Sequence, residues 1–446
     1  MIDQATTIKV VAVGGSVTVL FALLAALVSR GKIEGETSRK SAHVLVGATA
    51  VSIGWLFDDS LPVAILSGLA LTSAVAVRVV PSMRSRFGAV VHGVDRRSFG
   101  DCCFPAVVPV VHWLAMPDVA MYVIPVLVLT LADSAAALVG KRFGCWAYRT
   151  DEGSKTVEGS AALGAVTGIV VFAGLLLAGQ DFFRAGSTAL LVTILVVLAE
   201  AVCWRGLDNI VLPMGTLALL RMYDTMPDQA VLQRVVVALL ICGFAVAWRG
   251  RAGLIGAAGL AAAFVVYASW ALGGLVWAIP PLAILVALPF FGGRWADTRD
   301  EDLGVGVVLS MGIVPLLWLF LHETELIRDT LGSFLAAWAA VLGLTLVVRW
   351  RRDRLIGAID RLLIPKTLLA LVLIASACCL LPGGFAAPRS TAGIAGLAFA
   401  SALILEGIGD LERRGIGASA VWSIRTGIVA VGSSAGFAPL LWGGAA

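Results

Sequence analysis

Charged residues are scarce in this sequence, and this scarcity excludes most soluble classes of protein. Asp, Glu, Lys and Arg make up 14% of the 446 residues, whereas 59% are hydrophobic. Soluble domains carry about 25% charged residues. The seven cysteines are scattered and form no CxxC pair or His/Cys cluster at zinc spacing, so we expect neither a disulfide framework nor a zinc centre. The composition predicts an integral membrane protein.

The apolar runs are long and lack the strict alternation of barrel strands, which leaves helices as the spanning elements. We therefore predict an all-α, polytopic transmembrane helical bundle of roughly fifteen spans. The first run, from Ile8 to Val28, is longer than the apolar part of a signal peptide, and we expect a retained helix. A polar break, YDTMPDQ, suggests two domains, residues 1–225 and an additional transmembrane helical domain at 226–446 whose role the sequence does not give.

Lysine and arginine are concentrated in alternate connections between the apolar runs. The basic connections are 30–40, 81–101, 140–159, 249–251 and 349–354. The connections at Asp58–Asp59 and at Asp118 carry few or no basic residues. The positive-inside rule places the basic connections in the cytoplasm and the N-terminus outside. No transit-like segment is visible, so we expect a bacterial plasma membrane with the polar clusters described below on its cytoplasmic face.

The segment LADSAAALVGKRFG, residues 131–144, places an acid inside an apolar run. An intramembrane carboxylate is costly and is by default a functional candidate, here a hard oxygen ligand for Mg²⁺. On a helix, Gly140 and Gly144 lie on the same face as Asp133 and leave room for a nucleotide to approach the backbone. The alternative is a packing face of small residues with a satisfied Asp133.

The stretch GSKTVEGS, residues 153–160, is a polar loop between apolar runs. Lys155 is a candidate cation for phosphate oxygens, and Thr156 and Ser160 are candidate hydroxyl donors. Glu158 is a candidate second metal ligand, and Gly159 permits close approach of the backbone. The alternative is a helix cap with Lys155 as a membrane-face anchor. The spacing argues against a capping box, because the residue three positions after Thr156 is a glycine.

Three further clusters fall on the same cytoplasmic face. RKSAH supplies Arg39, Lys40 and His43; DRRSFGD supplies Arg97 and Asp101; RGLDN supplies Asp208 and Asn209. For the first two clusters the alternative is an ordinary positive-inside flank. Glu200, shortly before RGLDN, is a second intramembrane acid. We interpret His92, His112 and His322 as structural; the HETEL segment around His322 lacks the second histidine of a zinc-protease helix.

These motifs in this order make residues 1–225 similar to the CTP-dependent polyprenol kinase family, which includes dolichol, farnesol and phytol kinases. The motifs that carry the resemblance are RKSAH, RSFGD with Phe104–Pro105, ADSAAALVGKRFG, GSKTVEGS, and Glu200 with RGLDN and Pro213. The related CDP-diacylglycerol synthases share the Asp–Gly–Gly helix and the Lys-Thr-x-Glu-Gly element. Their members usually carry tyrosine where this chain has Ala137, and RKSAH and RSFGD favour the kinases.

The resemblance implies a membrane kinase that transfers a phosphoryl group from CTP to an isoprenoid alcohol delivered by the bilayer lipid. It implies Mg²⁺ as the cofactor, and we assign Asp133 and Glu158 as its ligands. Lys155, Arg39 and Lys40 would contact the phosphates, and either Asp101 or Asp208 would orient the attacking hydroxyl. A nucleic acid is not expected as a partner, and the sequence leaves the alcohol and the oligomeric state open.

Two other functions remain as alternatives. A cytidylyltransferase would use the same cations and metal to attack the α-phosphorus of CTP. A transporter would use Asp133 and Glu200 as ion-coupling sites, although transporter sites lie near the midplane of the bilayer whereas these clusters lie at one face.

Overall fold

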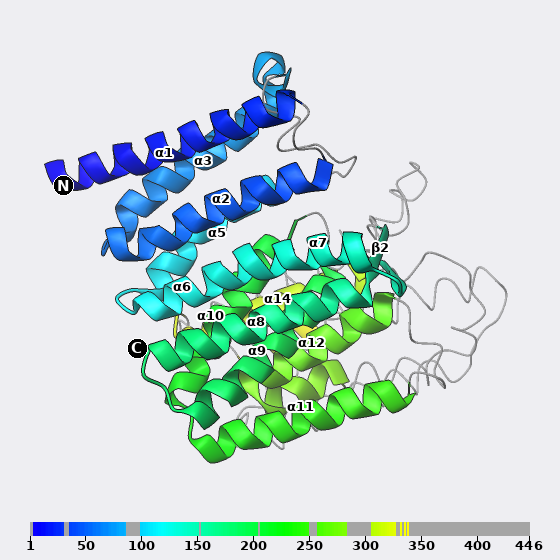
Figure 1. Cartoon of the computed structure of the whole chain (residues 1–446). Helices are drawn as coiled ribbons and strands as arrows, with labels where there is room; N and C mark the ends of the chain where they lie inside the picture. The colour runs from blue at the N-terminus through cyan, green and yellow to red at the C-terminus, as the bar shows by residue number, and fades with distance from the viewer. Residues whose placement is uncertain are drawn as a thin grey trace, which may run out of the picture. The chain divides into compact units, whose positions relative to one another are not determined.

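The computed structural model describes residues 3–30, 35–85, 99–150, 153–203, 206–248, 257–282 and 305–326, with five further positions between 331 and 338. The helices of the first half are α1 (Gln4–Ser29), α2 (Gly35–Leu56), α3 (Ser60–Val79), α5 (Gly100–Ala115), α6 (Val119–Leu127), the π-helix η1 (Val128–Ala132), α7 (Asp133–Phe143), α8 (Val157–Leu177), α9 (Phe182–Val202), α10 (Asp208–Thr225) and α11 (Asp228–Trp248). They are followed by α12 (Ala257–Gly273) and α14 (Val305–Glu323). The strands β1 (Ala147–Thr150) and β2 (Gly153–Thr156) lie between α7 and α8 (Figure 1).

The described chain is predominantly helical, as the sequence predicts for a membrane protein. Five of its helical segments are long and apolar enough to cross a membrane. They are Gln4–Ser29, Ser60–Val79, Val119–Phe143, Val157–Leu177 and Phe182–Val202. The helix Gly100–Ala115 is apolar but shorter than these five segments. The predicted spans in the last hundred residues of the sequence lie outside the described residues.

Contacts between Cα atoms divide the chain into two compact units, Met1–Gly243 and Phe244–Ala446. The predicted boundary at 225/226 coincides with the turn between α10 and α11. Most of α11 belongs to the first unit, so the observed division lies within this helix rather than before it. Every cluster that the sequence analysis singled out lies in the first unit.

Aspartates cap the helices that begin at the weakly basic connections. Asp59, Asp118 and Asp181 each accept a hydrogen bond from a backbone N–H in the first turn of α3, α6 and α9. Asp3 does the same for α1 through the N–H of Thr6. Such caps satisfy donors that the helix itself cannot satisfy. The acids of these connections thus have a structural use at helix starts.

The segments α6, η1 and α7 form one continuous helical rod from Val119 to Phe143, packed against α2, α8 and α10. Small residues allow this close packing, because a Cβ atom added to Gly47 of α2 would lie 2.1 Å from the Thr130 hydroxyl oxygen. Buried side chains such as Val128 and Leu129 line η1. The rod therefore forms the core of the first unit, with Asp133 at the junction of η1 and α7.

The β1–β2 hairpin is the one departure from an all-helical fold in the described residues. Its strands pair antiparallel, with Ala147 opposite Thr156 and Tyr148 opposite Lys155. The Trp146 carbonyl accepts a hydrogen bond from the Val157 N–H at 2.9 Å, which joins the base of the hairpin to the start of α8. The hairpin thus holds Lys155 in extended backbone immediately before a membrane helix.

His112 has the structural environment that the sequence analysis proposed for it. The ring is fully buried in α5, and its Nδ1 lies 2.8 Å from the Ser60 hydroxyl. Its Nε2 donates to the Phe57 carbonyl at 3.0 Å. Because both ring nitrogens have partners, His112 joins α5 to the start of α3. His92 lies outside the described residues.

Candidate functional site

Three carboxylates from different parts of the sequence meet inside the first unit. One oxygen each from Asp133, Glu200 and Asp208 lies within 4.8 Å of the other two. Asp133 and Glu200 are buried, and Asp208 is partly buried. Three acids at such distances repel one another strongly in a low-dielectric interior, so the group needs cations to balance it.

The π-helix positions the first of these acids and a histidine beside it. In η1 the Leu129 carbonyl accepts a hydrogen bond from Nε2 of His43, at 3.2 Å, and the same nitrogen lies 3.6 Å from Asp133. The ring of His43 packs edge-on against Phe104, with 5.2 Å between centroids. Single turns of π-helix occur frequently at functional sites. Here the π-helical turn lies directly before Asp133. Through His43, it brings the RKSAH cluster next to Asp133 and Phe104.

Lys40 is the first of two lysines that neutralise the carboxylates. Its ammonium group donates to Asp133 Oδ2 at 2.5 Å. The lysine side chain is 3% exposed, so its positive charge is buried with the acid. Lysine is rarely buried without a paired charge, and this pair therefore fixes the relative position of α2 and α7.

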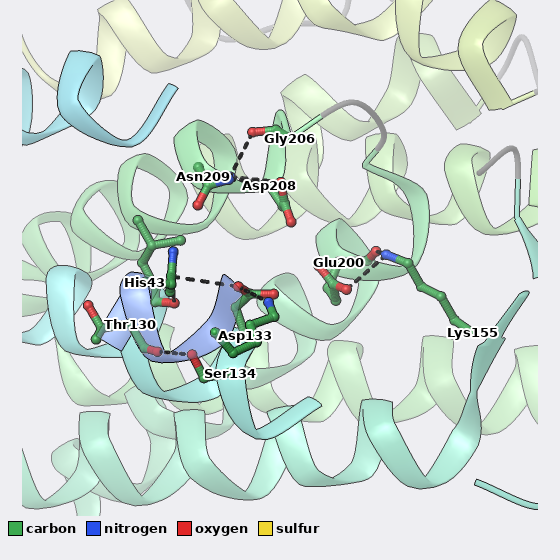
Figure 2. A network of polar contacts seen from close by, with 11 residues as sticks. His43, Thr130, Asp133, Ser134, Lys155, Glu200, Gly206, Asp208 and Asn209 are labelled. Atoms are coloured by element: carbon green, nitrogen blue, oxygen red, sulfur yellow. Dashed lines mark hydrogen bonds and ion pairs between the residues drawn. The ribbon is translucent and has the colours of Figure 1, made fainter. Parts of the chain in front are cut away.

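Lys155 is the second lysine that neutralises the carboxylates, and it reaches them from the β1–β2 hairpin (Figure 2). Its ammonium group donates to Glu200 Oε1 at 2.8 Å and also to the backbone carbonyl of Glu200. The side chain of Lys155 is 20% exposed, which makes it the more accessible of the two lysines. The contact joins β2 to the C-terminal end of α9, 45 residues away.

RGLDN supplies the third acid and an amide. Gly206 has a φ of +88°, which favours glycine, and α10 begins two residues later at Asp208. The Asn209 side-chain amide donates to the Gly206 carbonyl at 3.2 Å (Figure 2). Asp208 lies at the first position of α10, outside the five candidate spans. Burial, followed by the charges of Glu200 and Asp133, raises the pKa of Asp208 to about 7.

The donor set fits a hard divalent cation. One oxygen of these carboxylates, Glu200 Oε2, is buried and has no hydrogen-bond partner among the described residues, and the same holds for Oδ1 of Asn209, the residue after Asp208. Buried polar oxygens are normally satisfied, and oxygens of these two types are ligands that Mg²⁺ accepts. The residues present would therefore hold Mg²⁺ through Asp133, Glu200 and Asp208.

Three helices begin at this group. Lys40 lies in the second turn of α2, Lys155 two residues before α8, and Asp208 is the first residue of α10. Helix N-termini carry a partial positive charge and unsatisfied N–H groups, which favour anions such as phosphate. The end of the bundle that holds the three acids therefore also has features suited to a polyphosphate.

Glu158, predicted as the second metal ligand, lies outside the three-carboxylate group found among the described residues. Its carboxylate instead accepts hydrogen bonds from the Trp146 N–H, at 3.2 and 3.3 Å. The backbone changes from strand to helix between Lys155 and Glu158, and the two side chains consequently diverge. Glu200, which the sequence analysis noted as an intramembrane acid but left out of the ligand set, is the ligand candidate in its place.

The DRRSFGD cluster contributes differently from the prediction. Asp101 forms a two-pronged ion pair with Arg78 of α3, with 3.0 Å from Nε to Oδ2, and lies outside the carboxylate group. Of the two acids proposed to orient the hydroxyl, Asp208 is the one within the group. Arg97 lies outside the described residues, and Arg39 is half-buried next to Lys40 in α2.

The hydroxyl residues of GSKTVEGS have local partners. Thr156 is the N-cap of α8 and accepts from the Gly159 N–H at 3.2 Å. A helix cap, the alternative considered for this loop, is therefore present, without the reciprocal half of a capping box. Ser160 shares a 2.8 Å hydrogen bond with the Tyr148 hydroxyl of the hairpin. Both contacts stabilise the junction that carries Lys155.

The glycines pack helix against helix. A Cβ atom on Gly140 would lie 2.8 Å from the Thr156 hydroxyl, and one on Gly159 would lie 2.8 Å from the Ala136 carbonyl. On Gly144 it would lie 2.5 Å from Thr156 Cγ2. This is the packing face of small residues that the sequence analysis considered as the alternative. The space beside Gly140 and Gly144 is filled by Thr156 at the start of α8, and the space beside Gly159 is filled by the backbone of α7.

No protein-family model, no curated protein and no solved structure matches this chain.

Proposed function

We propose that this protein is an integral membrane kinase that transfers the γ-phosphoryl group of CTP to a long-chain isoprenoid alcohol. The observation that supports the proposal is the convergence of motifs. Four of the motifs that resemble the polyprenol kinases supply Lys40, Asp133, Lys155, Glu200 and Asp208 to one group. The fifth adds Phe104, which packs on His43. Residues spread over 169 positions of sequence would not share one buried polar group unless the fold required it.

The chemistry requires charge neutralisation more than covalent catalysis. The hydroxyl oxygen of the alcohol forms a bond to the γ-phosphorus, and the bond from this phosphorus to the β–γ bridging oxygen breaks. CDP leaves, and the hydroxyl proton passes to the carboxylate of Asp208. Lys40 and Lys155 are the cations available for the phosphate oxygens, and Asp208 orients the attacking hydroxyl.

Asp133, Glu200 and Asp208 would hold Mg²⁺. When bound, Mg²⁺ supplies positive charge to the phosphate oxygens. The residues around it exclude water, because Asp133 and Glu200 lie within helical segments long and apolar enough to span a membrane. An isoprenoid tail would approach from the bilayer along the helices, on which large apolar side chains are exposed.

The deciding experiment uses the purified full-length protein in detergent with Mg²⁺ and a panel of prenols of different chain length. CTP is labelled at the γ-phosphorus in one set of reactions and at the α-phosphorus in another. The proposal requires γ-label in the lipid product, and chelation of the metal must abolish the incorporation. Absence of γ-label with every prenol would contradict the proposal.

The same reactions test the cytidylyltransferase alternative, because its site would use the same lysines and carboxylates. Attack on the α-phosphorus transfers the nucleotide and releases pyrophosphate, so the α-label would then enter the lipid. In the reactions that test the cytidylyltransferase, the lipid acceptor of the nucleotide is phosphatidic acid. The two labels therefore separate the functions without any change in the protein.

A further inference from the structure

The two lysines occupy carboxylates that a metal ion would need. Lys40 pairs with Asp133, and Lys155 pairs with Glu200, so two of the three acids already have a cation. With all three acids ionised, the five side chains carry a formal charge of −1. A divalent cation that enters this group meets two ammonium groups that already hold its ligands.

We propose that Lys40 and Lys155 are resident cations that weaken metal binding until a nucleotide arrives. The inference rests on the proposed function, since it concerns the order in which the same site fills. The phosphates of the nucleotide would draw the ammonium groups away from Asp133 and Glu200, and the released carboxylates would take the metal. Metal and nucleotide then bind as a coupled pair, and each raises the affinity for the other.

The two lysines differ in how they take part. Lys155 extends from a hairpin, is 20% exposed, and also donates to the Glu200 backbone carbonyl. Lys40 is 3% exposed and lies within α2. A flexible lysine side chain at the edge of the group can turn toward an incoming phosphate with little change of the backbone. Lys155 is therefore the cation that moves first.

The group also contains ligand capacity that the lysines leave unused. Within the group, Glu200 Oε2 is buried and has no partner among the described residues, and next to Asp208 in the sequence Asn209 Oδ1 is likewise buried without one. If the lysines were the final partners of the site, these oxygens would carry an uncompensated desolvation cost. Their presence favours a site built for a further cation.

The test measures binding of Mn²⁺ alone to the purified full-length protein, with the electron paramagnetic resonance signal of free Mn²⁺ as the readout. Mn²⁺ accepts the same oxygen ligands as Mg²⁺. Without nucleotide, Lys40→Met and Lys155→Met should each tighten Mn²⁺ binding at least about tenfold, because a competing positive charge is removed. Lys155→Arg retains the charge and should not tighten it. Equal or weaker Mn²⁺ binding by both methionine variants would overturn the inference.

A matched control is Lys9→Met. Lys9 donates to the Leu56 carbonyl at the far end of α2, which lies about 24 Å along the helix from Lys40 at 1.5 Å per residue. This variant should bind Mn²⁺ like the wild type. If it also tightens binding, the effect is one of overall charge and the inference fails.

A wild-type measurement covers the case in which the buried variants do not fold. Mn²⁺ should displace the Lys155 ammonium group from Glu200, so modification of Lys155 by an amine-reactive ester, followed by mass spectrometry, should rise severalfold when Mn²⁺ is added. An unchanged rate contradicts the inference. The proposed function is tested separately by γ-label transfer, so a protein that transfers the label but shows no gain of Mn²⁺ affinity refutes only the coupling.

Discussion

Lys40 Nζ lies 2.5 Å from Asp133 Oδ2, although 93 positions separate the two residues in the sequence. The contact joins α2 to the central rod of the first unit, and it is buried. Breaking a buried ion pair by removing one partner leaves an uncompensated charge. The pair therefore contributes to the relative placement of two helices as well as to the candidate site.

Asp133→Asn should abolish prenol phosphorylation while the protein stays folded in the membrane. Loss of a residue that merely orients a metal ligand already lowers metal affinity or activity about 10- to 100-fold, so loss of a ligand should cost about a hundredfold or more. The measurement is γ-label transfer from CTP by purified protein. Asp118→Asn is the matched control, because Asp118 lies just before the start of the same rod and an asparagine retains its capping oxygen. Wild-type turnover by Asp133→Asn would remove Asp133 from the site.

Lys155→Ala should lower turnover about a hundredfold, which is the usual effect of removing one group that stabilises developing charge. Lys141→Ala tests whether any lysine of the same basic connection matters, since Lys141 is exposed at the end of α7. This control should keep wild-type turnover. Comparable losses in both variants would show that the connection acts through its overall charge and not through Lys155.

The tight approach of α8 to α7 predicts a sharp difference between two glycines. In Gly159→Ala the new Cβ would lie 2.8 Å from the Ala136 carbonyl, a backbone atom that cannot move aside easily. We expect Gly159→Ala to lower the free energy of unfolding by about 1–3 kcal/mol, measured by thermal unfolding in detergent. Gly68→Ala is the matched helical control, because nothing lies within 4 Å of its new Cβ. Equal stability of the two variants would contradict the packing described for α7 and α8.

The sequence predicted much of the candidate site because intramembrane acids and lysines are conspicuous in an apolar chain. Asp133 is predicted from its place inside an apolar run, and Lys155 and Asp208 from polar clusters at the ends of such runs; the structure brings the three residues together. The prediction for Glu158 rests on its carboxylate and on its place in the same short stretch as Lys155. Nearness in sequence fails where the backbone changes from strand to helix, because the following side chains then take new directions.

The β1–β2 hairpin and the ion pairs between the acids and the two lysines could not be predicted from the sequence alone. Each strand has four residues, which is too short for an alternating pattern to be recognised, and the hairpin was expected as a loop. The pairing of Lys155 with Glu200 depends on where α9 ends relative to β2. That placement follows from helix packing across the bundle, which no local pattern records.

Substitution of Arg184, which lies at the other end of α9 from Glu200, should lower the stability of the protein. Its guanidinium group donates to the carbonyls of Tyr223, Asp224 and Met226 and pairs with Asp228 at 2.7 Å, which fixes the turn between α10 and α11 to α9. Hydrogen bonds from a charged donor stabilise a fold by about 1.5–3 kcal/mol each and are not additive. Arg184→Ala should therefore lower the free energy of unfolding by about 2–4 kcal/mol. The measurement is thermal unfolding in detergent.

A matched surface substitution provides the comparison for Arg184. Arg84 is exposed just after α3, and surface changes of this kind stay within about 0.5 kcal/mol. Arg84→Ala should therefore unfold at the wild-type temperature. A similar drop in both variants would mean that the arginine contacts at the α10–α11 turn add no stability of their own.

The orientation of the candidate site in the membrane can be tested with Cys145, which is exposed at the start of the hairpin. The basic connection 140–159 predicts that this thiol faces the cytoplasm, where CTP is available. The experiment uses a variant in which the other six cysteines are replaced by serine: Cys102, Cys103, Cys203, Cys242, Cys378 and Cys379. A membrane-impermeant maleimide should label Cys145 in inside-out vesicles and leave it unlabelled in intact cells.

The opposite face provides the control for this labelling. Asp58 is exposed in the acidic connection before α3, and Asp58→Cys in a background without other cysteines should be labelled in intact cells only. Cys145 and position 58 are separated by an odd number of predicted crossings, so they must give opposite results. Labelling of Cys145 from outside would place Asp133, Lys155 and Glu200 at the wrong face for a cytosolic nucleotide, and a kinase that draws on cytosolic CTP would then be excluded.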